Sequence, residues 1–269
     1  MQRINFTKMV ASGNDFVLID KSHQVTMPAG RQASFQSLAK KMCDRKFGVG
    51  ADGLLILEKS KVADVRMRIF NADGSEAEMC GNGARCSALY LGKSNVSFQA
   101  KAGIIKARVQ GEKVKINLTG PRGRKSDIPL KAGNRNIRVN FINTGVPHAV
   151  IFVEGLDSID VFNLGRAIRY HNRFAPAGAN VNFVETLNAN SIKIRTYERG
   201  VEDETLACGT GSVASALIFA LKTSAGNKVN VQTKSGEVLK VYFQRHDNKF
   251  SDVWLEGKAE IVYKGVYHV

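Results

Sequence analysis

Two cysteines stand at the head of the same short motif in different halves of the chain. Cys80 is followed by Gly81-Asn82-Gly83, and Cys208 is followed by Gly209-Thr210-Gly211. Glycine lets the backbone bend sharply and lets a ligand approach it closely. A helix that starts there presents free N–H groups and a partial positive charge, which should hold the pKa of a thiol below its usual value of about 8.5. The same N–H groups can bind a carboxylate, so each motif could provide a base and an anion site.

The second copy of the motif is what favours catalysis. One such motif alone is more often a tight turn around an inert, buried cysteine. Two copies packed about a pseudo-twofold axis would bring both helix starts to a shared cleft, where ligand sites prefer to form. Cys80 and Cys208 would then lie on opposite sides of a bound molecule. Cys43 and Cys86 lack this setting and are interpreted as packing residues.

The two motifs belong to an internal repeat of domain size. The cysteines are 128 residues apart, and three further pairs of segments recur in the same order at separations of 127 to 133 residues. A period of this length indicates two similar domains rather than a solenoid. The pairs are 50–52 with 178–180, 68–71 with 195–198, and 96–103 with 229–236.

Short apolar runs and a few helical stretches indicate how each copy folds. Helical periodicity appears at 36–42, 85–91 and 212–221. The predicted strands are 16–19, 53–57, 65–70, 114–118, 149–153, 192–197 and 237–243.

A stretch rich in glycine and proline, Gly120-Pro121-Arg122-Gly123, is expected to link the two copies. We therefore expect an α/β fold of the α+β type, with two pseudo-symmetric domains from an internal duplication. The expected domains are 1–119 and 120–261, and a C-terminal strand, 262–269, should return to pack on the first.

Composition excludes several classes of protein. The 269 residues contain 43% hydrophobic residues but no apolar run long enough for a membrane span, and the start of the chain lacks a signal sequence, so we expect a cytoplasmic protein. The cysteines and histidines lack metal-ligand spacing, so no metal is expected. The net charge of +15 raises nucleic-acid binding as a possibility. Basic residues are scattered, however, and the densest run, 121–125, contains no aromatic residues that could stack on bases.

Taken together, the motifs resemble those of the diaminopimelate epimerase family, in order and over essentially the whole chain. The segments that carry the resemblance are 12–16, 70–75, 80–86, 145–148, 197–200 and 207–211. The resemblance implies that each domain is a strongly curved sheet around a central helix, with the site between the domains. It also implies a reaction without pyridoxal phosphate or any other cofactor, in which LL- and meso-diaminopimelate are interconverted for lysine and peptidoglycan synthesis.

The resemblance also assigns roles by position. It implies that Cys80 and Cys208 transfer the protons and that His148 and Glu198 support the reacting centre and its amine. Arg199 would bind the distal carboxylate, a task that suits a bidentate guanidinium. The other implied substrate-binding residues are Gly81, Asn82, Gly209 and Thr210 at the reacting carboxylate, together with Asn14, Asn71 and Asn180.

Two positions depart from the pattern of some family members. Val146 stands where some members have asparagine, which removes one side-chain hydrogen bond to the distal end of the substrate. Gly53 stands where some have glutamine. Both departures concern the distal contacts and leave the proton-transfer chemistry unchanged.

Three alternatives remain open at this point. A racemase of the same architecture could act on proline or histidine, although Arg199 with Asn71 and Asn180 favours a substrate with a second carboxylate. A basic nucleic-acid-binding protein and a thiol redox protein are less favoured, the latter because no C-x-x-C occurs. A homodimer is among the expected assemblies, and a small-molecule substrate is the expected partner.

Overall fold

The computed structural model describes residues 3–22, 34–118, 120–133, 135–223, 225–247 and 249–268. The chain divides into two compact units. Unit 1 comprises 1–116 and 257–269, and unit 2 comprises 117–256. No helix in the described part of the chain is long and apolar enough to cross a membrane.

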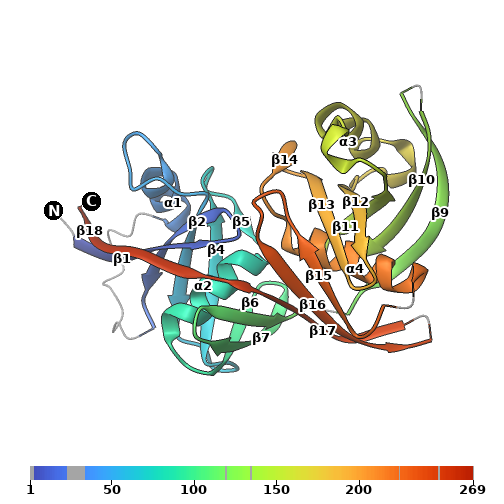
Figure 1. Cartoon of the computed structure of the whole chain (residues 1–269). Coiled ribbons are helices and arrows are strands. Elements are labelled where there is room, and N and C mark those ends of the chain that lie inside the picture. Colours follow the sequence, from blue (N-terminus) through green and yellow to red (C-terminus); the bar gives the residue numbers. More distant parts are fainter. Residues whose placement is uncertain are drawn as a thin grey trace. The chain divides into compact units, whose positions relative to one another are not determined.

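Unit 1 is a curved sheet that encloses one helix (Figure 1). Helix α2 (Gly81–Leu91) contacts strands at both ends of the sheet as well as in its middle, so the sheet must curl around it. Helix α1 (Phe35–Cys43) lies on β3 and β4. The strands are β1 (Arg3–Ala11), β2 (Asn14–Asp20), β3 (Gly53–Glu58), β4 (Val65–Asn71), β5 (Glu76–Ala77), β6 (Asn95–Ala100), β7 (Gly103–Gln110), β8 (Lys113–Asn117) and β18 (Glu260–His268).

Unit 2 is built in the same way around helix α4 (Gly209–Lys222). Helix α3 (Val161–Arg169) packs outside on β12 and β13. Two short 3₁₀ turns cover Leu156–Ser158 and Asn172–Phe174. The strands are β9 (Arg122–Ala132), β10 (Arg135–Asn143), β11 (Pro147–Phe152), β12 (Asn180–Asn188), β13 (Ser191–Glu198), β14 (Asp203–Thr205), β15 (Lys228–Gln232), β16 (Val238–His246) and β17 (Lys249–Lys258).

The two units share one strand order. In unit 1 the neighbours run β18-β1-β2-β3-β4-β6-β7-β8, and in unit 2 they run β9-β10-β11-β12-β13-β15-β16-β17. The parallel pairs occupy the same places, β2–β3 with β4–β6 and β11–β12 with β13–β15. Such a coincidence of order and direction confirms the predicted α/β fold of two repeated halves.

A helix that is enclosed by a sheet needs small or apolar side chains on nearly all of its surface. Every residue of α4 from Gly211 to Ala220 is buried, which is possible because this stretch contains only glycine, serine, alanine and apolar residues. Helix α2 is buried from Asn82 to Ala88 and includes one long polar side chain, Arg85, that is fully buried. A helix buried all round forms the centre of a unit rather than its surface.

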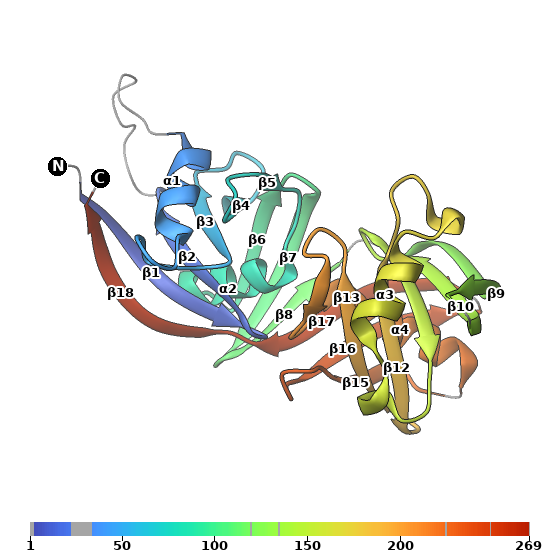
Figure 2. The same cartoon turned by 90° about the horizontal axis from the view of Figure 1, so that it is seen from above.

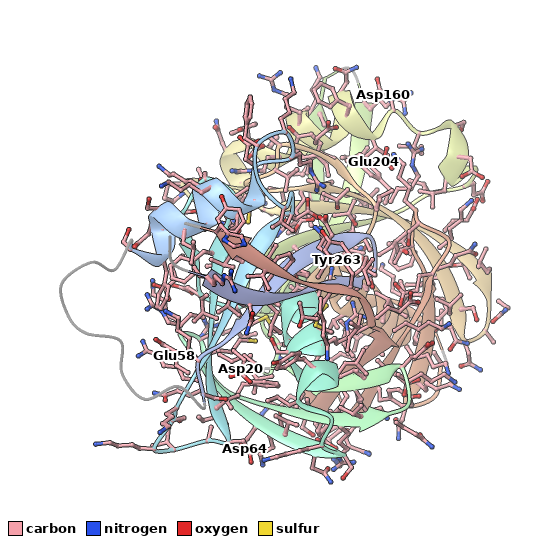
Figure 3. All side chains as sticks on the ribbon, turned by 90° about the vertical axis from the view of Figure 1, so that its left-hand side faces the viewer. Asp20, Glu58, Asp64, Asp160, Glu204 and Tyr263 are labelled. Carbon is pink, nitrogen blue, oxygen red and sulfur yellow. The ribbon has the colours of Figure 1, made fainter. Side chains whose placement is uncertain are left out.

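The last described strand, β18, closes the sheet of unit 1 by pairing antiparallel with β1. Their side chains pack together along the pairing, and the rings of Phe6 and Tyr263 meet edge to face with centroids 6.0 Å apart. Figure 2 shows the two strands side by side, and Tyr263 is labelled in Figure 3. Unit 1 therefore consists of two stretches of chain that are far apart in sequence.

All eight predicted strands, including the C-terminal one as β18, and all three predicted helices are present in the structure, with shifted ends. Helices α2 and α4 begin four and three residues earlier than predicted, so the glycines of both motifs lie in the first turn. The predicted linker is wrong in its second half, because β9 already begins at Arg122 and contains Gly123 in a left-handed conformation, φ 67°. Helix α3 was not predicted. The described strands that were not predicted are β1, β5, β6, β7, β9, β10, β12, β14, β15 and β17.

Candidate active site

Cys80 caps the start of α2. Its backbone is extended, φ −141° and ψ 119°, and its Sγ accepts the N–H of Gly83 at 3.4 Å. A Cβ on Gly83 would stand 2.8 Å from a methyl carbon of Leu55, closer than side chains ordinarily approach. Glycine at this position therefore lets the first turn press against β3 while the thiol stays at the helix start.

Cys208 occupies the N-cap position of α4 with a similarly extended backbone, φ −118° and ψ 111°, but its sulfur makes no capping hydrogen bond to a backbone N–H in the described first turn. Its Sγ lies 3.6 Å from Oγ1 of Thr210. A Cβ on Gly211 would collide with Oδ1 of Asn182 and would stand 3.2 Å from the sulfur. Both predicted motifs thus fold into a helix start with a cysteine at the cap, which is the local geometry that the sequence indicated.

A chain of hydrogen bonds fixes the polar residues beside Cys80. Asn82 donates to Oδ1 of Asn14 at 2.6 Å, and Asn14 donates to Asp52 at 3.0 Å. The buried guanidinium of Arg85 donates to Oδ1 of Asn82 and to Ser12 at 2.7 Å. The structure therefore brings together two predicted substrate-binding residues, Asn14 and Asn82, and adds Arg85, which the sequence analysis had not singled out.

Charged residues surround Asp15 and Asp52, the two acids next to Asn14. Burial alone would raise the pKa of Asp15, but hydrogen bonds from Arg45 and Lys8 lower it to about 2. Arg45 also donates to Asp52 at 2.7 Å, so one guanidinium holds both acids. Asp15 is therefore ionised at neutral pH, and this half of the site is positioned by charge.

Asn71 lies at the end of the sheet that also carries Asn14, and the directions of three neighbouring strands show why. Strands β2 and β3 are parallel and start at this end, and β4 is antiparallel to β3 and finishes there, with Asn71 opposite Gly53. The Asn71 amide donates to Ser75 at 2.9 Å. Asn71 therefore lies at the sheet end that also carries Asn14.

Unit 2 repeats this arrangement with different side chains. His148 is the second residue of β11 and lies opposite Asn180, which opens β12, and Glu198 ends β13. The amide of Asn180 donates to the carbonyl of Pro147 at 3.1 Å and accepts the N–H of Arg199 at 2.9 Å. Asn180 therefore clamps the segments that carry His148 and Arg199 to each other.

Glu198 is the acid beside Cys208. Burial raises the pKa of Glu198, and hydrogen bonds with Thr205 and with the Cys208 side chain offset part of that rise. The Thr205 hydroxyl donates to the carboxyl group at 2.9 Å. A carboxyl group and a thiol that share a hydrogen bond form a pair between which a proton can move.

His148 is wholly buried and neutral. Burial, with a smaller contribution from the charge of Arg199, lowers the pKa of His148 to about 3. Its Nδ1 lies 3.1 Å from Nδ2 of Asn182. Asn182 was not predicted, although its position two residues after Asn180 in a strand puts both side chains on one face.

The other cysteines lack these features. Burial raises the pKa of Cys43 to about 11 and raises the pKa of Cys86 further. Both side chains are buried, Cys43 in α1 and Cys86 in α2. In the described residues, no group of three or more histidine, cysteine, aspartate or glutamate side chains could hold a metal ion.

Comparison with known proteins agrees over the full length. The model of the family described as diaminopimelate epimerase matches residues 6–137 and 140–262. The diaminopimelate epimerases of Aquifex aeolicus and Methanocella arvoryzae are each 43% identical to the chain, and the alignments cover 97% and 98% of it and 97% of each relative.

Solved structures with the same fold are more distant in sequence. A phenazine biosynthesis protein of the PhzF family from Bacillus anthracis superposes with a TM-score of 0.77 at 19% identity, covering 100% of both chains. A probable proline racemase from Agrobacterium radiobacter superposes with a TM-score of 0.70 at 14% identity, covering 99% of this chain and 92% of that one. At these sequence identities the similarity concerns the fold alone.

Proposed function

Because the chain belongs to the diaminopimelate epimerase family, we propose that it is an isomerase that interconverts LL- and meso-diaminopimelate. In this role it serves lysine and peptidoglycan precursor synthesis, in the cytoplasm and without pyridoxal phosphate or a metal. The observation that carries the proposal is the pair of helix-capping cysteines, Cys80 and Cys208, in equivalent places of two repeated units.

The helix starts stabilise the charge that develops in the reaction. The α-hydrogen of an amino acid is only weakly acidic, so negative charge on the reacting carboxylate must be stabilised as the proton leaves. The backbone N–H groups at Gly81-Asn82 and at Gly209-Thr210 are the donors we assign to this carboxylate. They are fixed by folding, so they need no rearrangement during the reaction.

Two thiol groups divide the proton transfer. One cysteine, as thiolate, removes the α-proton from one face of the carbon, and the other, as thiol, delivers a proton to the opposite face. The roles exchange with the direction of the reaction, and the pair titrates as a unit. Glu198 supports Cys208 through their shared hydrogen bond, and His148 supports the reacting centre as a neutral group.

Residues around the helix starts bind the rest of the substrate. We assign Arg199 to the distal carboxylate, since a guanidinium can bind it through two hydrogen bonds. Asn14, Asn71 and Asn180 complete the binding set. Asn180 also positions its neighbours, because its side-chain amide binds the backbone carbonyl of Pro147 and the backbone N–H of Arg199.

Deuterated water provides the decisive test. The purified protein is incubated with LL-diaminopimelate and the products are separated by chiral chromatography. If each cysteine serves one face, deuterium enters the inverted product from the first turnovers and little enters recovered substrate. A single base serving both faces would return the original proton and leave the product with little label.

A same-fold racemase of proline or histidine is the second candidate, favoured by the fold of the Agrobacterium neighbour. The Arg199 guanidinium is half-buried in the structure, and a bound substrate would cover it further. A guanidinium that is covered without a carboxylate partner is costly, so monocarboxylic amino acids should react at least about 100-fold more slowly. Equal turnover of proline, histidine and diaminopimelate would exclude the substrate assignment and leave the two-thiol mechanism intact. Nucleic-acid binding is not favoured by any feature of the site.

Two further proposals concern organisation. We propose that the evolutionary repeats are 1–119 and 120–261, with 262–269 added to the first. We also propose that the protein is a homodimer, which size-exclusion chromatography with light scattering would test.

A further inference from the structure

Asn182 contacts the histidine of the site from the next strand. Its side chain is fully buried on β12, between β11 and β13. Three groups surround its amide: the carbonyl of Ala149 at 3.2 Å, Nδ1 of His148 at 3.1 Å, and the hydroxyl of Thr196 at 3.0 Å. Each neighbour restricts which atom of the amide can face it.

The carbonyl of Ala149 fixes the orientation of the amide. A carbonyl oxygen can only accept a hydrogen bond, so the Asn182 atom 3.2 Å from it must be the NH₂ nitrogen. The Asn182 oxygen then faces Thr196, whose hydroxyl can donate to it. The reverse orientation would set two oxygen atoms against each other in a buried place.

The orientation of the amide in turn fixes the histidine. The NH₂ group has two hydrogens, one for Ala149 and one for Nδ1 of His148. Nδ1 must therefore accept, and the single proton of the neutral ring must be on Nε2. Nε2 is buried and has no hydrogen-bond partner among the described residues. A buried donor without an acceptor is costly, which indicates that its acceptor arrives with the substrate.

We propose that Asn182 is a positioning residue that holds His148 in the Nε2–H tautomer, so that His148 acts as a hydrogen-bond donor in the reaction and not as its base. The second half of this statement rests on the proposed function, while the first half concerns the protein alone. Asn182 also lies against Gly211 in the first turn of α4, so one side chain contacts both His148 and the helix that Cys208 caps.

The tautomer can be measured without substrate. Protein labelled with ¹⁵N in its five histidines is studied at pH 7 by long-range ¹H–¹⁵N correlation, and the His148 signals are assigned by their loss in His148→Gln. We expect a pyridine-like Nδ1 and a pyrrole-like Nε2. A pyrrole-like Nδ1, or an imidazolium ring, would overturn the proposal whatever the activity.

Asn182→Asp tests the cause. An oxygen replaces the NH₂ group at nearly constant size, so the preferred partner for it is a protonated Nδ1, and the proton should move from Nε2 to Nδ1. With the donor lost, kcat for diaminopimelate should fall about 100-fold, the usual effect of removing one preorganised donor, with a much smaller change in KM. An unchanged tautomer, or a changed tautomer with unchanged kcat, would refute the proposal.

Thr196→Val is the matched control. It removes the hydroxyl that contacts the Asn182 oxygen but leaves the NH₂ group facing Ala149 and His148, so the His148 spectrum should keep the wild-type pattern. A switch of tautomer in this variant would show that Asn182 is not what fixes the ring. An Nε2–H ring in a protein that does not turn over diaminopimelate would refute the proposed function and leave the positioning role standing.

Discussion

The starts of α2 and α4 have nearly the same backbone but different polar surroundings. Both begin with a cysteine in extended conformation, followed by glycines that leave no room for a Cβ. In the turn after Cys80 lies the buried cation of Arg85, and 128 residues later its place is taken by the apolar Val213. Duplication has preserved the geometry of the helix start, and the two copies have diverged in how they hold it.

The same divergence appears at the sheet ends. Asp15, in unit 1, is ionised and held by Lys8 and Arg45. His148, in unit 2, is neutral and held by the amide of Asn182. In unit 1 this position is held by ion pairs, and in unit 2 it is held by neutral hydrogen bonds.

The largest effect should come from removing either thiol. Cys80→Ala and Cys208→Ala should each lower kcat by about 1,000-fold or more in both directions, because every turnover of the proposed mechanism needs both groups. Chiral chromatography of the diaminopimelate isomers measures this loss. Cys43→Ala is the control and should retain activity, since that thiol is buried in α1. A Cys208→Ala protein with near wild-type activity would show that the start of α4 has only a structural role and is not a second catalytic position.

The free energy of unfolding should fall with pH in two windows, one set by His148 in unit 2 and the other by Asp15 in unit 1. His148 has a lowered pKa in the folded state, so between its unfolded value near 6.5 and about 3 the unfolded chain binds the proton. Stability is therefore lost as pH falls, by about 1.4 kcal/mol for each pH unit from 6 to 4. The lowered pKa of Asp15 has the same sign but acts later, from near 4 down to about 2.

Urea unfolding at a series of pH values can resolve these windows. His148→Gln should flatten the curve above pH 4, and Asp15→Asn should flatten it below pH 4. The exposed residue His246 provides the control, and His246→Gln should leave the slope from pH 6 to 4 unchanged. An unchanged slope in His148→Gln would mean that the histidine is not held neutral.

The smallest effect should be the loss of stability when the crowded glycine in the first turn of each helix, Gly83 or Gly211, is changed to alanine. Gly211→Ala should destabilise the fold by about 2 kcal/mol, because the new methyl group meets a buried amide on a strand. Gly83→Ala should cost less, since it meets the end of a leucine side chain that can move. Thermal unfolding compares them, with Gly226→Ala as a control at a glycine that has open space around it. Equal losses would mean that both helix starts are equally rigid.

Local pattern was enough to predict three of the four α-helices and eight of the eighteen strands in the described part of the chain, together with both cysteine caps. The repeat also indicated two similar halves, because matching segments kept their order. The helix starts were placed too late because glycine disfavours helix in general, whereas here it is required by close packing. Strand β9 was missed because most of its residues are exposed and five of its eleven residues are charged, so it has little apolar alternation. Strand β10 does alternate, at Ile137, Val139 and Phe141, and this signal was overlooked.

The supporting residues of the site could not be read from the sequence. Asn82 meets Asn14 from 68 positions away, and Asn182 meets His148 from 34. The packing of α2 on β2 brings Asn82 to Asn14, and the register of β11 and β12 brings Asn182 to His148. A single sequence carries no signal of either. Arg85 would have been assigned to solvent by its residue type, since arginine is seldom fully buried.

The pairing of β18 with β1 sets the order in which the units can be completed during translation. The ribosome makes β1 before the other described strands and β18 after all of them, so β1 waits through most of synthesis with one edge unpaired. Residues 117–256 are continuous and can finish folding during that interval. The usual order, in which the N-terminal domain folds first, is thus reversed for the final step. A nascent chain arrested just before residue 260 would carry one finished unit and one with an open edge, where chaperones and aggregation would compete.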